Sequence, residues 1–171
     1  MKIIKNLLKL LVLSLVIGVV SCLDDQVDDI AYTPEREAAI ISQYVDSLKS
    51  NGYEVDTSDV GVIYTIIEEG EGVFPQAGDS IGVIYIGYFP ESGTIFDASD
   101  VWYEGGIWKL TYLSTNVIAG FNDAIAHLNK DAEGLFLMPS ALAYGPDGSY
   151  DGSIPPYSPL VFDIKLMDFY N

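Results

Sequence analysis

Short runs of apolar residues dominate the chain from residue 61 onward, and their pattern is typical of β-strands. The runs are rich in Val, Ile, Tyr and Phe, and turns that contain Gly, Pro, Asp or Asn separate them. From these runs we predict strands at Val62–Ile67, Ser80–Tyr88, Trp108–Leu113, Leu135–Met138 and Leu160–Phe169.

A single helical pattern interrupts the strands, from about Gly120 to Leu128. The spacing of its apolar residues places them in one stripe on one side of a helix. The stripe consists of Phe121, Ala124, Ile125 and Leu128. A curved antiparallel sheet wrapped around one short helix would bury both this stripe and the apolar side of the strands. We therefore predict an α+β domain over residues 61–171.

A second amphipathic helix is predicted ahead of this domain, within residues 34–60. Thr33 is a suitable N-cap, Pro34 suits the first helical position, and Asn51-Gly52 ends the pattern. Its apolar positions are Ile41, Tyr44, Val45 and Leu48. The helix could pack on the domain, act as a spacer or form a dimer contact. Packing is favoured, because one short helix is marginal in water unless its apolar stripe is covered.

The first 21 residues have the composition of an export signal. Lys2, Lys5 and Lys9 form a positive region, and an apolar stretch from Leu10 to Val20 follows it. A membrane span is the alternative, but a span needs ~20 apolar residues. The stretch is shorter than that and leads into an acidic cluster. We therefore predict a signal peptide at residues 1–21.

Cys22 follows the predicted signal peptide and is the only cysteine of the chain. It has no partner for an intramolecular disulfide and no companion for a metal site. The run Val19-Val20-Ser21-Cys22 resembles a bacterial lipobox, which implies acylation of Cys22 and an anchor in the membrane. A stray cysteine in an ordinary signal peptide is the alternative. Residues 22–33 contain an acidic cluster and are interpreted as a flexible tether.

These features predict a bacterial envelope protein, an outer membrane lipoprotein that faces the periplasm or the cell surface. The chain has 8 basic and 25 acidic residues and a formal net charge of −17. Binding to nucleic acid requires clustered Lys and Arg, which this chain lacks, so we expect no nucleic-acid partner.

Several short motifs occur in an order that resembles the FKBP-type peptidyl-prolyl isomerases. They are Val83-Ile84-Tyr85-Ile86-Gly87-Tyr88, Ile95-Phe96-Asp97-Ala98-Ser99, Val117-Ile118-Ala119-Gly120-Phe121, Ala143-Tyr144-Gly145, Ile154-Pro155-Pro156 and Leu160-Val161-Phe162-Asp163. The resemblance covers about residues 61–171. It implies the α+β fold predicted above, prolyl isomerase activity and no cofactor. The implied partners are proline-containing polypeptides and inhibitors of the macrolide immunosuppressant type.

The resemblance also implies roles for individual residues. Asp97 matches the pocket carboxylate of the family, while the amide N–H of Ile118 and the hydroxyl of Tyr144 match groups that bind peptide carbonyls. The implied substrate-binding walls are Tyr85, Phe96, Trp108, Val117, Phe121, Ala143, Ile154 and Phe162. Without the resemblance, aromatic residues on strands are more typical of a core. Tyr144 is different, because it lies in a turn sequence, where aromatic residues often serve binding.

The implied reaction needs neither a nucleophile nor a metal. Rotation about an X-Pro bond meets a barrier of ~18–20 kcal/mol, and no bond is broken. A catalyst therefore needs only a site that binds the twisted amide better than the planar one.

Two departures from the family pattern bear on activity. The segment from Ala98 to Trp108 has no cation, whereas the family often has an arginine there that holds the aspartate. We therefore expect Asp97 to rely on Tyr85 alone. The second departure is a longer loop from Pro146 to Ser153. The missing arginine, and Phe121 at the floor position where the family frequently has a tryptophan, favour the alternative function, a non-catalytic proline-peptide-binding or chaperone module of the same fold. A third reading is a structural surface lipoprotein.

Two further features are interpreted as unrelated to catalysis. The run from Asp147 to Gly152 has the opening rhythm of a calcium loop, but Ser158 stands where the bidentate Glu should be, so no metal is expected. His127 is interpreted as a surface or boundary residue, since the reaction requires no base.

Overall fold

The computed structural model describes residues 32–113 and 116–170. The predicted signal peptide, the predicted acylation site Cys22 and most of the predicted tether lie outside these residues. Within them, no helix is both long enough and apolar enough to cross a bilayer.

The N-terminal helix is present as α2 (Pro34–Ser50). As predicted, Thr33 caps it, and its hydroxyl oxygen accepts a hydrogen bond from the amide of Arg36 at 3.2 Å. The predicted apolar stripe is confirmed in part, because it includes the buried Leu48 but omits Ile40. Ile40 is buried together with Leu48, whereas Ile41 is only half-buried. The face toward the domain therefore passes through Ile40.

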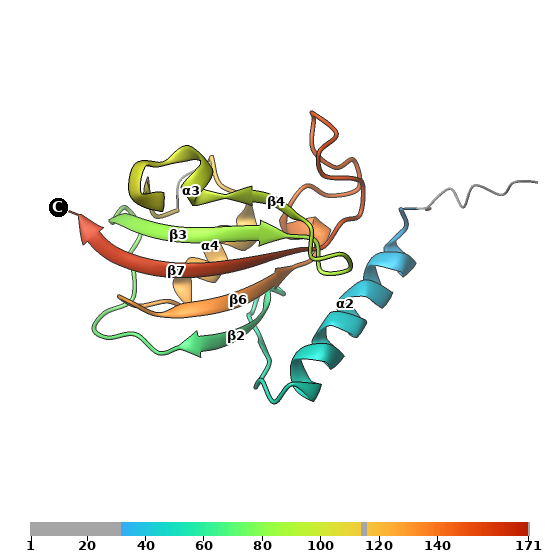
Figure 1. Ribbon diagram of the computed structural model, residues 1–171, viewed down its shortest axis with the longest axis horizontal. Coiled ribbons are helices and arrows are strands. Elements are labelled where there is room, and N and C mark those ends of the chain that lie inside the picture. The colour runs from blue at the N-terminus through green and yellow to red at the C-terminus, as the bar shows by residue number, and fades with distance from the viewer. Residues whose placement is uncertain (1–31, 114–115, 171) are drawn as a thin grey trace, which may run out of the picture. The chain divides into compact units, whose positions relative to one another are not determined.

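The sheet is antiparallel throughout and has the order β1-β2-β6-β7-β3-β4, with β5 paired to β3 (Figure 1). Its strands are β1 (Asp56–Thr57), β2 (Ile63–Glu68), β3 (Ser80–Tyr88), β4 (Ile95–Ala98), β5 (Trp108–Thr111), β6 (Glu133–Met138) and β7 (Leu160–Tyr170). The predicted strands are confirmed within about two residues. The sequence did not predict β1 and β4, because such short strands show too few alternations to be recognised.

Three short helical turns were also not predicted: α3 (Ser99–Trp102), η1 (Glu104–Gly106) and η2 (Ser140–Leu142). The expectation that a single helix interrupts the strands was therefore wrong. A turn of three or four residues has no apolar period that a sequence pattern could reveal.

The helix α4 (Ala119–Ala126) lies against one face of the sheet, as predicted (Figure 1). Its residues Phe121, Ala124 and Ile125 are all at most 2% exposed. Gly120 permits the close approach of α4 to β6, because a Cβ atom at this position would lie only 2.8 Å from the sulfur of Met138 on β6.

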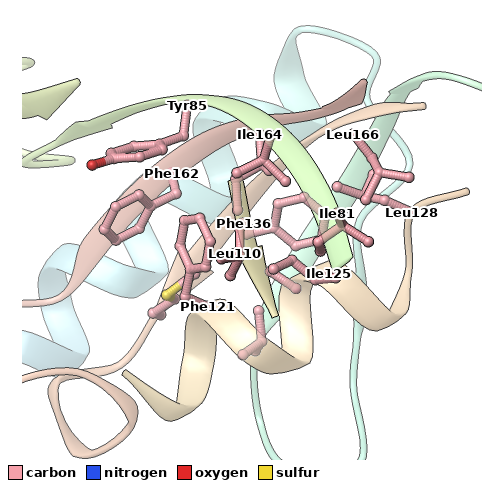
Figure 2. Close-up of a cluster of buried hydrophobic side chains, with 14 of the residues drawn as sticks. Ile81, Tyr85, Leu110, Phe121, Ile125, Leu128, Phe136, Phe162, Ile164 and Leu166 are labelled. Atoms are coloured by element: carbon pink, nitrogen blue, oxygen red, sulfur yellow. The ribbon is translucent and has the colours of Figure 1, made fainter. Parts of the chain in front are cut away.

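The sheet contributes its own buried residues to this core. Tyr85 on β3 pairs with Ile164 on β7, and Ile164 pairs with Gly134 on β6, so these positions share one face. Figure 2 shows Tyr85, Phe162 and Ile164 above Phe121 of α4, with the hydroxyl of Tyr85 pointing away from the cluster. Tyr85 thus belongs both to the core and to the lining of the candidate site.

Candidate functional site

One cavity of about 200 Å³ collects most of the residues predicted to act on substrate. Its walls come from β3, β4, β5 and β7, from the start of α4 and from the turn after η2. The lining residues are Tyr85, Asp97, Trp108, Asn116, Val117, Ile118, Phe121, Tyr144 and Phe162. Only Asn116 was not predicted. It precedes the Val117 motif directly, and its polar side chain gave no sign of a role in an apolar pocket.

The floor of this cavity is made of aromatic rings that also belong to the core. The ring of Phe121, which is 2% exposed, has its centroid 5.6 Å from Tyr85, 5.7 Å from Trp108 and 5.3 Å from Phe162. The contacts with Tyr85 and Phe162 are edge-to-face, which is a favourable arrangement of ring quadrupoles. The floor is thus held by packing on three sides, and Figure 2 shows two of the neighbours, Tyr85 and Phe162, beside Phe121.

Three predicted wall residues do not line the cavity. Phe96 packs edge-to-face on Phe162, with 5.5 Å between the ring centroids. Gly87 makes room for this pair, since a Cβ atom there would lie 2.7 Å from Phe96 and 2.9 Å from Phe162. Ile154 is 3% exposed within the core, and Ala143 packs against the same core. These residues support the walls from the core side.

Asp97 is bound on both of its carboxylate oxygens. The hydroxyl of Tyr85 donates to Oδ2 at 2.9 Å, and the indole N–H of Trp102 donates to Oδ1 at 2.8 Å. The expectation that Asp97 relies on Tyr85 alone was therefore wrong. Trp102 belongs to α3, in the segment that lacks a cation, and an indole supplies a donor without a charge. No charged residue marks this partner in the sequence, so it was not predicted.

Two tyrosine hydroxyls stay protonated around this carboxylate. Burial is the main reason that the pKa of Tyr85 is raised well above its usual range, and its hydrogen bond to Asp97 adds to the shift. The pKa of Tyr144 is also raised, first by burial and then by the charges of Asp97 and Asp151. Tyr144, at 41% exposure, therefore keeps a proton that it can donate into the cavity.

Ile118 lines the same cavity. It is the N-cap residue of α4, with φ −58° and ψ 147°. Backbone amides at the start of a helix have no acceptor inside the helix, which suits this end of α4 to binding a carbonyl oxygen.

The loop that follows Tyr144 is held by its own side chains. Asp151 accepts hydrogen bonds from the Ser149 hydroxyl at 2.7 Å and from the Ser153 hydroxyl and amide at 2.8 and 3.1 Å. These hydrogen bonds lower the pKa of Asp151 to about 2, and the bond from Ser149 has the largest effect.

Across residues 32–113 and 116–170, no three His, Cys, Asp or Glu side chains cluster as metal ligands.

His127 lies outside the cavity lining. Its ring stacks on Tyr64 with 4.2 Å between the centroids, and its Nε2 atom lies 3.7 Å from Asp123. The residue therefore belongs to the boundary of the core.

Comparison with known proteins agrees with this geometry. The family model described as FKBP-type peptidyl-prolyl cis-trans isomerase matches residues 71–167, more than half of the chain. The chain is 37% identical over 122 residues to a probable FKBP-type peptidyl-prolyl cis-trans isomerase of Neisseria meningitidis. That match covers 70% of this chain but only 43% of the relative, so the chain spans less than half of that protein's length.

Shorter relatives match over nearly their whole length. The FK506-binding protein 1 of Gibberella zeae is 32% identical over 108 residues, which cover 63% of this chain and 96% of the relative. A crystal structure of a peptidyl-prolyl cis-trans isomerase from Pseudomonas syringae superposes with a TM-score of 0.65 at 27% identity, covering 82% of this chain and 98% of that one. The chain belongs to the FKBP-type peptidyl-prolyl cis-trans isomerase family.

Proposed function

We propose that this protein is a prolyl isomerase that assists the folding of exported proteins. The observation that carries the proposal is the cavity, in which Tyr144 and the fixed carboxylate of Asp97 stand over a floor of buried aromatic rings. Its volume of about 200 Å³ is below the roughly 300–1,000 Å³ of sites for drug-sized ligands. That size favours one proline-sized side chain as the occupant.

The mechanism follows from the chemistry of the walls. Resonance with charge separation stabilises the planar amide, and a dry aromatic cavity solvates that charge poorly, which disfavours the planar form. The Tyr144 hydroxyl and the Ile118 amide would hold flanking peptide carbonyls and so orient the proline. Each ~1.4 kcal/mol of preference for the twisted amide gives about a tenfold acceleration. Asp97 transfers no proton and acts as a fixed charge.

A non-catalytic proline-peptide-binding or chaperone module of the same fold is the second candidate. The absence of a cation next to Asp97 among the residues that the structure describes favours this candidate. Where the family often has an arginine that holds the aspartate, Trp102 supplies only an uncharged N–H donor. Both candidates bind proline peptides, and only the first accelerates their isomerisation. Ligands of the macrolide immunosuppressant type are proposed for both, with one ring of the macrolide in the cavity.

The site of action is proposed to be the bacterial envelope. Cys22 and the export signal before it support a lipid-anchored protein, although both lie outside the described residues. The anchored domain would face either the periplasm or the cell surface. The negative charge of the tether would repel the anionic bilayer and so keep the domain away from it.

The function is tested by a protease-coupled isomerisation assay on residues 23–171, with peptides that vary the residue before proline. We expect catalysis that a macrolide of this class inhibits. Tyr144→Phe keeps the ring and removes one hydrogen bond worth about 0.5–1.5 kcal/mol, so the rate should fall about two- to tenfold. Tyr150→Phe is the matched control, because Tyr150 is fully exposed on the same loop.

Binding of peptide by the parent without any rate above the uncatalysed one would favour the chaperone candidate. Equal rates for Tyr144→Phe and Tyr150→Phe would remove Tyr144 from the proposed mechanism. Absence of both peptide and macrolide binding would favour the structural lipoprotein.

The hydrogen bond from Trp102 yields a separate prediction. Trp102→Phe removes the donor to Asp97 but keeps an aromatic ring, and we expect the isomerisation rate to fall about two- to tenfold. Asp97→Ala should also lower the rate with little loss of melting temperature, because no buried cation is left unpaired. Val101→Ala, on the neighbouring residue that is 68% exposed, is the control and should leave the rate unchanged. An unchanged rate in Trp102→Phe would show that Tyr85 alone suffices.

The proposed anchor is tested on Cys22. Cys22→Ser should move the protein from the membrane fraction to the soluble fraction or stall its processing, because a serine cannot be acylated in this way. Fractionation of the mature protein and mass spectrometry of its N-terminus measure this. If a properly cleaved Cys22→Ser protein stays with the membrane, the anchor lies elsewhere.

A further inference from the structure

Glu37 of α2 is the one acidic side chain that is buried within the described part of the chain, with 9% of its surface exposed. A carboxylate in such a place is costly unless hydrogen bonds satisfy its oxygens. Both oxygens are bound by Ser140: the Ser140 amide donates to Oε1 at 2.5 Å, and the Ser140 hydroxyl donates to Oε2 at 2.8 Å. This pair links positions that are 103 residues apart in the sequence.

Ser140 in turn holds the turn that presents Tyr144. It is the first residue of η2, and its carbonyl accepts hydrogen bonds from the amides of Ala143 and Gly145, each at 2.8 Å. Tyr144 lies between these two amides. The Ser140 carbonyl therefore fixes the backbone on both sides of Tyr144, whose side chain lines the cavity.

From these contacts we infer that Glu37 is a positioning residue of the isomerase site, which acts through Ser140 on the hydroxyl of Tyr144. The helix α2 then contributes to the function of the site, although none of its residues lines the cavity. This inference rests on the isomerase activity proposed above. It assigns a purpose to a buried charge that an apolar residue could replace if packing alone were needed.

Two other polar contacts join α2 to residues of the domain other than Ser140. The hydroxyls of Tyr44 and Tyr88 lie 2.7 Å apart, and Arg36 pairs with the exposed Glu91 in the β3–β4 loop. Tyr44→Phe removes one link between the same helix and the domain without touching Ser140. It therefore separates loosening of α2 from loss of the Glu37 contact.

The decisive experiment is a double-mutant cycle on the full chain, with kcat/KM for a proline peptide as the readout. Glu37→Leu removes both hydrogen bonds and puts an apolar residue with good helix propensity in their place. We expect it to lower kcat/KM about three- to tenfold in the parent, and less than about twofold in a Tyr144→Phe background. Glu37→Gln keeps one acceptor and should restore part of the rate, and it replaces Glu37→Leu if that variant does not fold.

If the losses of transition-state free energy from the two substitutions were additive, the inference would be overturned, because Glu37 would then not act through the Tyr144 hydroxyl. An unchanged kcat/KM with a lowered melting temperature would overturn it as well, by showing a structural role only. An equal loss in Tyr44→Phe would assign the effect to the docking of α2 as a whole and not to Glu37.

A second measurement distinguishes failure of this inference from failure of the proposed function. The NMR signal of the Tyr144 ring, assigned from its absence in Tyr144→Phe, reports the position of the ring without any activity. We expect Glu37→Leu to shift this signal and Tyr44→Phe to leave it in place. If the parent is inactive but the signal shifts in this way, the positioning role stands and the isomerase proposal fails; an unmoved signal overturns the positioning role.

Discussion

The contact of Phe121 in α4 with Tyr85 and Phe162 in the sheet is the interaction on which the rest of the structure depends. These rings close the core on one side and form the floor of the cavity on the other. Because protein cores are densely packed, a floor made of core residues is held rigidly. The site therefore obtains its shape from the same packing that stabilises the fold, and Gly87 and Gly120 allow the close approaches that this packing needs.

Neighbouring side chains hold the carboxylate of Asp97 in this cavity. The two donors to Asp97 come from β3 and α3, so the carboxylate also joins the sheet to the segment that follows β4. Trp102 achieves this while 70% of its surface stays exposed, which leaves an aromatic face beside the cavity. A neutral donor in place of a cation keeps the carboxylate in position and leaves its negative charge uncompensated.

Sequence patterns predicted the parts of the molecule that repeat or that follow a known motif order. The ends of β3 were predicted to the residue, and the resemblance to the family predicted eight of the nine residues that line the cavity. The patterns missed contacts between distant segments, such as that of Glu37 with Ser140, since no local signal marks a partner 103 residues away. They also missed α3, and with it Trp102, because one helical turn has no measurable period.

The central claim is that the cavity accelerates rotation of a prolyl bond in a bound peptide. Exchange spectroscopy by NMR tests it directly, with a proline peptide in large excess over the protein and no coupled protease. The account predicts exchange cross-peaks between the cis and trans signals of the peptide on a timescale at which the free peptide shows none, because uncatalysed isomerisation takes tens of seconds or longer. Peptide signals that shift on binding without cis–trans cross-peaks would contradict it.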